Sequence, residues 1–204
     1  MTAWYRNTEW NDEIAADFEK RLARSRHQKA QNLSLQGHAL IPRHPKVARD
    51  LLTRAVAFDD PHETPRALAF LALAHLAHGD IEGALASYET ALERQAAQPN
   101  LIAVQPADYL FLIGVFRRAE RLPAALPIAD AMPDETLFGP DPQVHAAKAL
   151  VYDMAGRGDE ARAYAALALP LMETLPDATA LEIDIGRLRG RLEAIASGQG
   201  GTDG

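Results

Sequence analysis

The chain has 204 residues, a formal net charge of −7 at pH 7 and no cysteine. Hydrophobic residues make up 48% of it, which is ample for an ordered core, and the lack of cysteine excludes disulfides, thiolate metal sites and cysteine nucleophiles. The acidic balance argues against a nucleic-acid partner, because neutralising phosphates requires an extended basic face.

The composition also favours an all-helical protein, because aromatic residues amount to only 6% and β-branched residues are sparse. No segment approaches the roughly 18 uninterrupted apolar residues of a membrane span. The first ten residues lack the basic start and apolar run of a secretory signal. We therefore expect a cytoplasmic protein that does not engage a membrane.

The first predicted element is an N-terminal helix over residues 9–26. Its apolar residues Ile14, Phe18 and Leu22 lie on one stripe, with acidic residues in the first turns and arginines late, an order that complements the helix dipole. No Pro or Gly interrupts the chain before Gly37. We therefore expect this helix to run into the next one, bent rather than broken.

Residues 65–98 form the most regular helix–turn–helix pattern of the chain. Ala72 is the small residue at which two helices would cross closely, and Gly79 can adopt the left-handed conformation that ends a helix. The inner face of the second helix would carry Ala84, Tyr88 and Ala91. At these positions the stretch resembles a single tetratricopeptide repeat, which is a pair of antiparallel helices over about 34 residues.

Such a repeat cannot bury its apolar face alone, so the resemblance implies stacked neighbours. A second clear copy covers residues 142–175, and weaker copies cover 30–61 and 107–136. The small residues at the expected helix crossings recur at close to the repeat period, with one enlarged loop after the best copy. They are Gly37, Ala72, Gly114 and Ala149.

The third copy contains two prolines that disturb its second helix. Pro123 is tolerated in a first turn, whereas Pro127 removes a hydrogen bond and clashes with the preceding turn. We therefore expect a short, late or bent helix there. An irregular insert over residues 107–140 is the alternative.

Together these patterns predict one all-α domain over residues 1–197. The resemblance implies a short right-handed α-α superhelix of about four TPR-like helix pairs, closed by a capping helix over 177–197. The small, polar residues 198–204 are expected to be disordered. The opening, residues 4–11, resembles that of a set of uncharacterised bacterial TPR-like proteins, which implies no biochemical role.

Apparent chemical motifs fall at repeat positions. His75, His78 and Asp80 suggest a metal site, but His75 occupies a place where such a repeat usually carries an aromatic residue. The glycines of 156–161 match a dinucleotide-binding loop, yet a helix rather than a strand is expected before them. We therefore predict no catalytic residue, no metal and no cofactor.

In repeats of this family the first helices line a concave groove, and here the predicted lining is apolar at its centre. It comprises Ser34, His38, Ala69, Leu73, Phe111, Val115, Ala146 and Leu150. The Lys/Asn/Arg set with which some relatives hold a peptide carboxylate is absent from these places. The pattern therefore predicts a non-catalytic interaction module that binds a partner helix or peptide.

Three alternatives stay open at this stage. The chain's own N-terminal helix could fill the groove, or the groove could join two copies of the chain as a homodimer. The third alternative is an enzyme, or the regulatory subunit of one. Its small-molecule pocket would lie between the repeats and the N-terminal segment, near Trp4 and Trp10.

Overall fold

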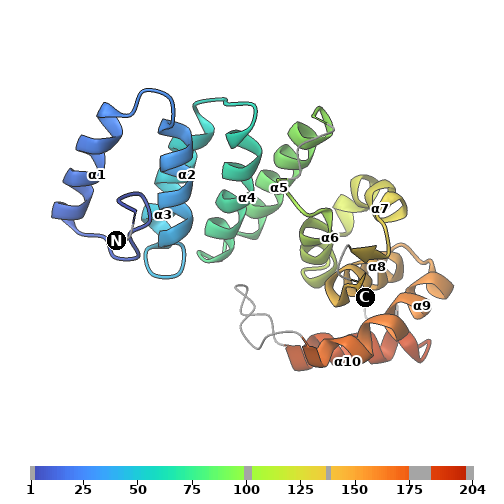
Figure 1. Cartoon of the computed structure of the whole chain (residues 1–204). Coiled ribbons are helices and arrows are strands. Elements are labelled where there is room, and N and C mark those ends of the chain that lie inside the picture. The colour runs from blue at the N-terminus through green and yellow to red at the C-terminus, as the bar shows by residue number, and fades with distance from the viewer. Residues whose placement is uncertain (1–2, 99–102, 137–138, 175–184, 201–204) are drawn as a thin grey trace. The chain divides into compact units, whose positions relative to one another are not determined.

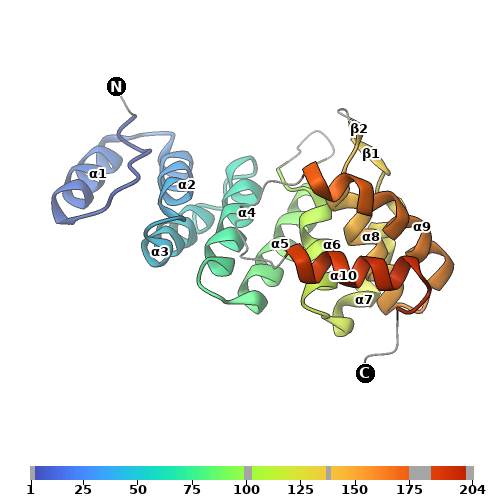
Figure 2. The same ribbon diagram turned by 90° about the horizontal axis from the view of Figure 1, so that it is seen from below.

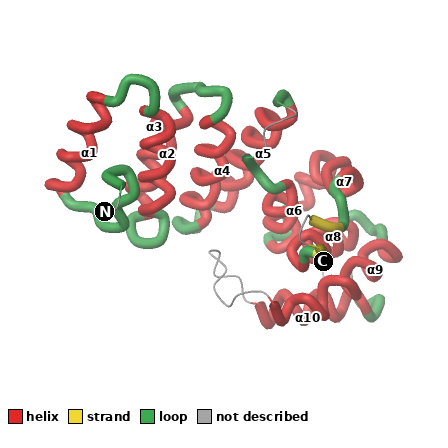
Figure 3. The backbone as a smooth tube through the Cα atoms, viewed as in Figure 1, coloured by secondary structure: helices red, strands yellow, loops and turns green. Residues whose placement is uncertain are grey.

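The computed structural model describes residues 3–98, 103–136, 139–174 and 185–200 (Figure 1). The described chain is helical apart from one hairpin of two-residue strands, which confirms the all-α prediction (Figure 3). Within these residues, no helix combines the length and apolarity needed to cross a membrane. The helices fall into two compact units, residues 1–104 (unit 1) and 105–204 (unit 2).

Unit 1 contains five helices within its described residues. They are α1 (Asp12–Arg24), α2 (Lys29–Leu40), α3 (Pro45–Val56), α4 (Glu63–Leu76) and α5 (Ile81–Ala96). The helices α2 and α3 pack together as one pair, and α4 and α5 as another, while α4 also contacts both helices of the first pair (Figure 1). The first pair spans residues 29–56 and the second residues 63–96, where the sequence predicts repeats over 30–61 and 65–98.

The N-terminal helix does not continue into α2, so the expectation of one bent helix is wrong. The helix α1 ends at Ser25, whose backbone is extended, although neither Pro nor Gly is present. The break lets α1 fold back, so that Phe18 and Leu22 join the core formed by α2, α3 and α4. A continuous helix would carry this apolar stripe away from the core.

Close helix packing in unit 1 depends on Gly37 of α2. A Cβ atom at this position would lie 2.6 Å from Cγ of Leu52 on α3, which is closer than van der Waals contact permits. The N-terminal segment before α1 also packs on this core, through Trp4, Tyr5 and Trp10. The predicted crossing residue thus brings α2 and α3 together.

The described part of unit 2 contains α6 (Pro106–Val115), α7 (Leu122–Ala131), α8 (Pro142–Met154), α9 (Gly158–Ala168) and α10 (Ile185–Ala196). Short 3₁₀ turns, η1 (Ala119–Arg121) and η2 (Leu169–Thr174), precede α7 and follow α9. The strands β1 (Glu135–Thr136) and β2 (Gly139–Pro140) pair antiparallel between α7 and α8. The helix α7 is short and contains Pro127, as predicted.

The helix α10 closes unit 2, with Leu188, Leu192 and Ile195 buried. It packs against α9 and α8 (Figure 2). The predicted start of this helix at residue 177 lies outside the described residues. The expected disorder after residue 197 does not extend to Gln199, whose backbone N–H donates to the carbonyl of Ala194 at 2.8 Å. Residues 201–204 are not described.

Candidate functional site

Half of the predicted groove residues are buried. Ser34, Phe111, Ala146 and Leu150 each expose 6% or less of their surface. Leu150 packs closely against Gly114 of α6. A Cβ atom added at Gly114 would lie 2.5 Å from Cβ of Leu150. Side chains this deeply buried offer a partner almost no surface, so four of the eight predicted positions are not available to line a groove.

The other four predicted residues keep accessible surface, and three of them belong to unit 1. His38 on α2 stacks on the ring of Phe70 on α4, with ring centroids 4.1 Å apart and planes inclined by 27°. Ala69 and Leu73 are half-buried on the same face of α4, because they lie one helical turn apart. We call His38, Ala69, Phe70 and Leu73 the α2/α4 platform. The fourth residue, Val115, lies at the end of α6.

The imidazole of the platform favours its neutral form. Partial burial lowers the pKa of His38, and the positive charge of Arg6 lowers it further. A neutral ring stacked on Phe70 presents an apolar, aromatic surface at neutral pH. Protonation at acidic pH would place a charge on the same surface.

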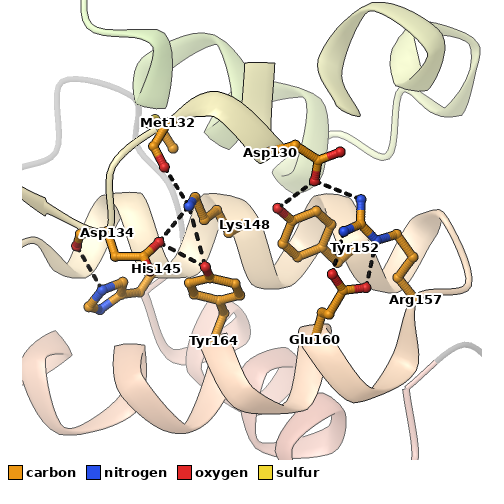
Figure 4. Close-up of polar contacts among 9 residues, drawn as sticks. All are labelled: Asp130, Met132, Asp134, His145, Lys148, Tyr152, Arg157, Glu160 and Tyr164. Carbon is orange, nitrogen blue, oxygen red and sulfur yellow. Dashed lines mark hydrogen bonds and ion pairs between the residues drawn. The ribbon is translucent and has the colours of Figure 1, made fainter. Parts of the chain in front are cut away.

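A cluster of polar side chains lies in unit 2, where the chain leaves α7 and meets α8 and α9 (Figure 4). From α8, His145, Lys148 and Tyr152 lie at helical spacing along one face. The last turn of α7, the chain after it, the N-cap of α9 and α9 itself supply the remaining members. We call the full set the polar cluster: Asp130, Met132, Asp134, His145, Lys148, Tyr152, Arg157, Glu160 and Tyr164.

Lys148 is the centre of one half of this cluster. Its side chain is only 3% exposed, and its ammonium donates to the carbonyl of Met132 at 2.6 Å and to Oδ1 of Asp134 at 2.5 Å. A longer contact of 3.4 Å reaches the hydroxyl of Tyr164, which itself donates to Asp134 at 2.8 Å. All three ammonium donors therefore have partners.

The second half of the cluster surrounds Asp130. Tyr152 donates its hydroxyl proton to Oδ1 of Asp130 at 2.9 Å, and the Arg157 guanidinium contacts the same oxygen at 2.7 Å. Arg157 also lies 4.2 Å from the ring centroid of Tyr152 and pairs with Glu160. These contacts connect the end of α7 to α8 and to the start of α9.

The electrostatics of the cluster favour fixed charge states. The hydrogen bond from Lys148 holds the pKa of Asp134 below its usual value, and that from Arg157 does the same for Asp130. Burial, followed by the hydrogen bond to Asp130, raises the pKa of Tyr152 far above its usual value. None of these shifts brings a group close to titration at neutral pH, as an acid–base catalyst would need.

One atom of the cluster has no partner within the described residues. Nε2 of His145 lies 3.0 Å from the backbone oxygen of Asp134, whereas Nδ1 is buried without a hydrogen bond. A carbonyl can only accept, so Nε2 carries a proton in this contact. The cluster as a whole is a clamp that holds the chain after α7 against α8.

The sequence signal for this clamp was a lysine at position 148, inside an otherwise apolar run of α8. Lysine is rarely buried unless it is paired. Its carboxylate partner, Asp134, lies 14 positions away in an irregular segment. Sequence spacing alone could not identify it.

His75 and Asp80, which the sequence suggests as metal ligands, have a structural role at the turn between α4 and α5. Asp80 caps α5 by accepting from the backbone N–H of Gly83 at 2.9 Å, and Nδ1 of His75 lies 2.8 Å from its other carboxylate oxygen. The described residues contain no group of three or more His, Asp or Glu side chains suited to hold a metal ion.

Comparison with known proteins adds no assignment to this geometry. No family model, curated protein or solved structure matches the chain.

Proposed function

We propose that the chain is a non-catalytic interaction module of TPR-like helix pairs, and that it binds a partner helix or peptide through the α2/α4 platform. The observation that carries this proposal is the stack of His38 on Phe70. It forms an aromatic surface, bordered by the half-buried Ala69 and Leu73, on two adjacent helices. Aromatic groups with a polar edge are enriched at protein interfaces.

The order of the helix pairs supports a TPR-like arrangement. The pairs α2/α3, α4/α5, α6/α7 and α8/α9 follow one another along the chain, and the predicted crossing residues Gly37 and Gly114 both lie at close helix contacts. In repeats of this kind, the first helix of each pair faces the bound partner. The platform belongs to two such helices, α2 and α4.

The electrostatics of the platform indicate the chemistry of the partner. Burial lowers the pKa of His38 and the positive charge of Arg6 lowers it further, so Arg6 is the cation that acts on the platform. A partner segment with an apolar side chain next to an acidic residue would place the former on the aromatic stack and the latter near Arg6. We propose a segment of this type as the occupant.

The test is a comparison of Leu73→Glu with Leu167→Glu. Leu167 on α9 is 51% exposed in unit 2, so it controls for an added surface charge. Partners captured from the native host by the wild-type chain would be identified and then titrated calorimetrically with each purified variant. We expect Leu73→Glu to weaken binding at least about tenfold and Leu167→Glu to leave it unchanged.

Circular dichroism and light scattering complete the experiment. The helical signal of both variants should equal that of the wild type, so that lost binding is not lost folding. Undiminished binding by a folded Leu73→Glu variant would refute the platform as the docking surface. A dimer in light scattering that only Leu73→Glu dissociates would identify a second copy of the chain as the occupant.

A further inference from the structure

Unit 1 contains a pocket of about 340 Å³ that the platform does not use. It lies between the N-terminal segment, the last turn of α1 and the first turn of α2. Its lining includes the aromatic residues Trp4 and Tyr5, the basic residues Arg21 and Arg24, and the polar residue Asn32. We call it the N-terminal pocket.

The aromatic wall of this pocket is held in place by buried contacts. Gln36 is fully buried, its Nε2 donates to the backbone oxygen of Asn7 at 2.8 Å, and its Oε1 accepts from the backbone N–H of Asn7 at 3.1 Å. Trp4 also rests against Phe18 of the core, with ring centroids 5.4 Å apart. The segment that carries Trp4 and Tyr5 is therefore anchored at both its backbone and its rings.

The stretch of chain that supplies Arg21 and Arg24 to the pocket lining is basic, although the whole chain is acidic. Residues 20–29 contain five Lys or Arg residues and no Asp or Glu, in a protein with a net charge of −7. Arg21 pairs with Asp17 at 2.8 Å, whereas Arg24 forms no ion pair within the described part of the chain. A local basic region in an acidic protein concentrates small anions at its surface.

We propose that the N-terminal pocket binds a small aromatic anion, meaning a planar ring that carries a phosphate or a carboxylate. The lining combines two aromatic residues, Trp4 and Tyr5, with Arg24, which forms no ion pair within the described residues and carries planar donors suited to an anionic group. Asn32, only 4% exposed, supplies a positioned amide whose Nδ2 bonds Ser25 at 3.3 Å. The pocket is separate from the α2/α4 platform, so this inference does not depend on the proposed docking function.

The proposal can be tested on the full chain with four probes of defined chemistry. AMP and 2-naphthoate each join a ring to an anion, adenosine has the ring alone, and inorganic phosphate has the anion alone. Binding would be measured by calorimetry and located by amide and indole N–H signals in NMR spectra. We expect at least one aromatic anion to bind about tenfold more tightly than adenosine and phosphate, and to shift the Trp4 indole signal.

Two arginine variants provide the matched comparison. Arg24→Gln should weaken binding of the aromatic anion about tenfold, whereas Arg26→Gln, which removes the same charge outside the pocket lining, should change it little. Preference for AMP over 2-naphthoate would identify the anion as a phosphate, and the reverse preference as a carboxylate. The proposal is overturned if neither aromatic anion shifts the Trp4 signal, if phosphate alone binds as tightly, or if Arg24→Gln binds like the wild type.

Discussion

The two units differ in how they fill the same helix-crossing position. In unit 1, Gly37 of α2 contacts Leu52 of α3, the partner helix within its own pair. In unit 2, Gly114 of α6 contacts Leu150 of α8, the first helix of the following pair. The same small residue in the sequence pattern therefore serves contacts within a pair in one unit and between pairs in the other.

The distorted helix α7 accounts for this difference. Its interior Pro127 and its late start leave only Ala125 and Ala129 buried along its length. Close packing of α6 against α8 and the polar cluster together replace the broad apolar contact that α3 makes in unit 1. A helix that is poor in buried apolar surface can thus be retained by hydrogen bonds and ion pairs to its C-terminal end.

The largest expected effect in testing this comparison is that of Gly114→Ala. The new methyl group would lie 2.5 Å from Cβ of Leu150, an atom that cannot move without its backbone, so α6 and α8 must separate. We expect a loss of about 3 kcal/mol in the free energy of unfolding. Gly37→Ala meets the more adaptable Cγ of Leu52 at 2.6 Å and should cost about 1–2 kcal/mol. Urea unfolding monitored by circular dichroism measures both.

A double-mutant cycle separates the two contacts. Leu52→Ala removes the atom that Gly37→Ala meets, so this pair should be less destabilised than the sum of its single changes by about 1 kcal/mol. Leu52→Ala should not relieve Gly114→Ala. Equal costs for the two glycine changes, with no coupling to Leu52, would contradict the proposed difference between the units.

The next effect concerns the buried ammonium of the polar cluster. Lys148→Met keeps the apolar stem but leaves the carbonyl of Met132 without its donor. It also removes the ion pair of Asp134, which is 53% exposed and keeps the hydrogen bond from Tyr164. We expect a loss of about 2 kcal/mol, with hydrogen exchange accelerated first at the end of α7. Lys46→Met, at an exposed site on α3, should change stability by less than about 0.5 kcal/mol.

Helix positions could be predicted because the signals that set them are local. Gly79 and Gly156 end helices through left-handed backbone conformations that glycine adopts readily, and both turns lie where the sequence placed them. Pro127 likewise acts locally, because its ring disrupts the hydrogen bonding of α7. The break between α1 and α2 could not be predicted from local signals, because it depends on the packing of Phe18 and Leu22 against residues of α2, α3 and α4 that are distant in the sequence.

The candidate sites were only partly predictable, for a related reason. The face of α8 was assigned from a repeat pattern, yet this helix is buried continuously from Val144 to Tyr152. A helix buried on all sides has no periodicity that marks an outer face. The sequence pattern therefore predicts Ala146 and Leu150 in the groove and does not distinguish Lys148.

A smaller difference between the units should appear as the pH falls. The pKa of His38 is lower in the folded state, so the unfolded chain takes up a proton first as pH falls below about 6.5. Proton uptake by the unfolded state reduces the stability of unit 1 from that pH until the folded pKa is passed. Asp134 acts at lower pH, because its pKa is lowered in the folded state. The stability that its ionised carboxylate contributes to unit 2 is present above about pH 4 and is lost below it.

Residue-resolved hydrogen exchange between pH 7.5 and 3 distinguishes the two steps. His38→Gln should abolish the loss of exchange protection that begins near pH 6.5 in α2 and α4. Asp134→Asn should reduce the loss of protection below about pH 4 in α8 and α9. Identical pH profiles for the wild type and His38→Gln would show that the imidazole does not titrate differently in the folded and unfolded chains.

The smallest expected effect concerns the turns within the helix pairs. Gly79 in unit 1 has φ of 74°, and Arg117 occupies the corresponding turn between α6 and α7 with φ of 52°. Because a Cβ atom disfavours this region, Arg117→Gly should raise the stability of unit 2 by about 0.5 kcal/mol, after the loss of the arginine's own contacts. In Gly79→Ala nothing lies within 4 Å of the added Cβ, so only the backbone strain of the left-handed conformation changes. This variant should lose about 1 kcal/mol in the free energy of unfolding. Thermal unfolding of both variants tests whether the two turns are conformationally equivalent, and a stabilising Gly79→Ala would show that they are not.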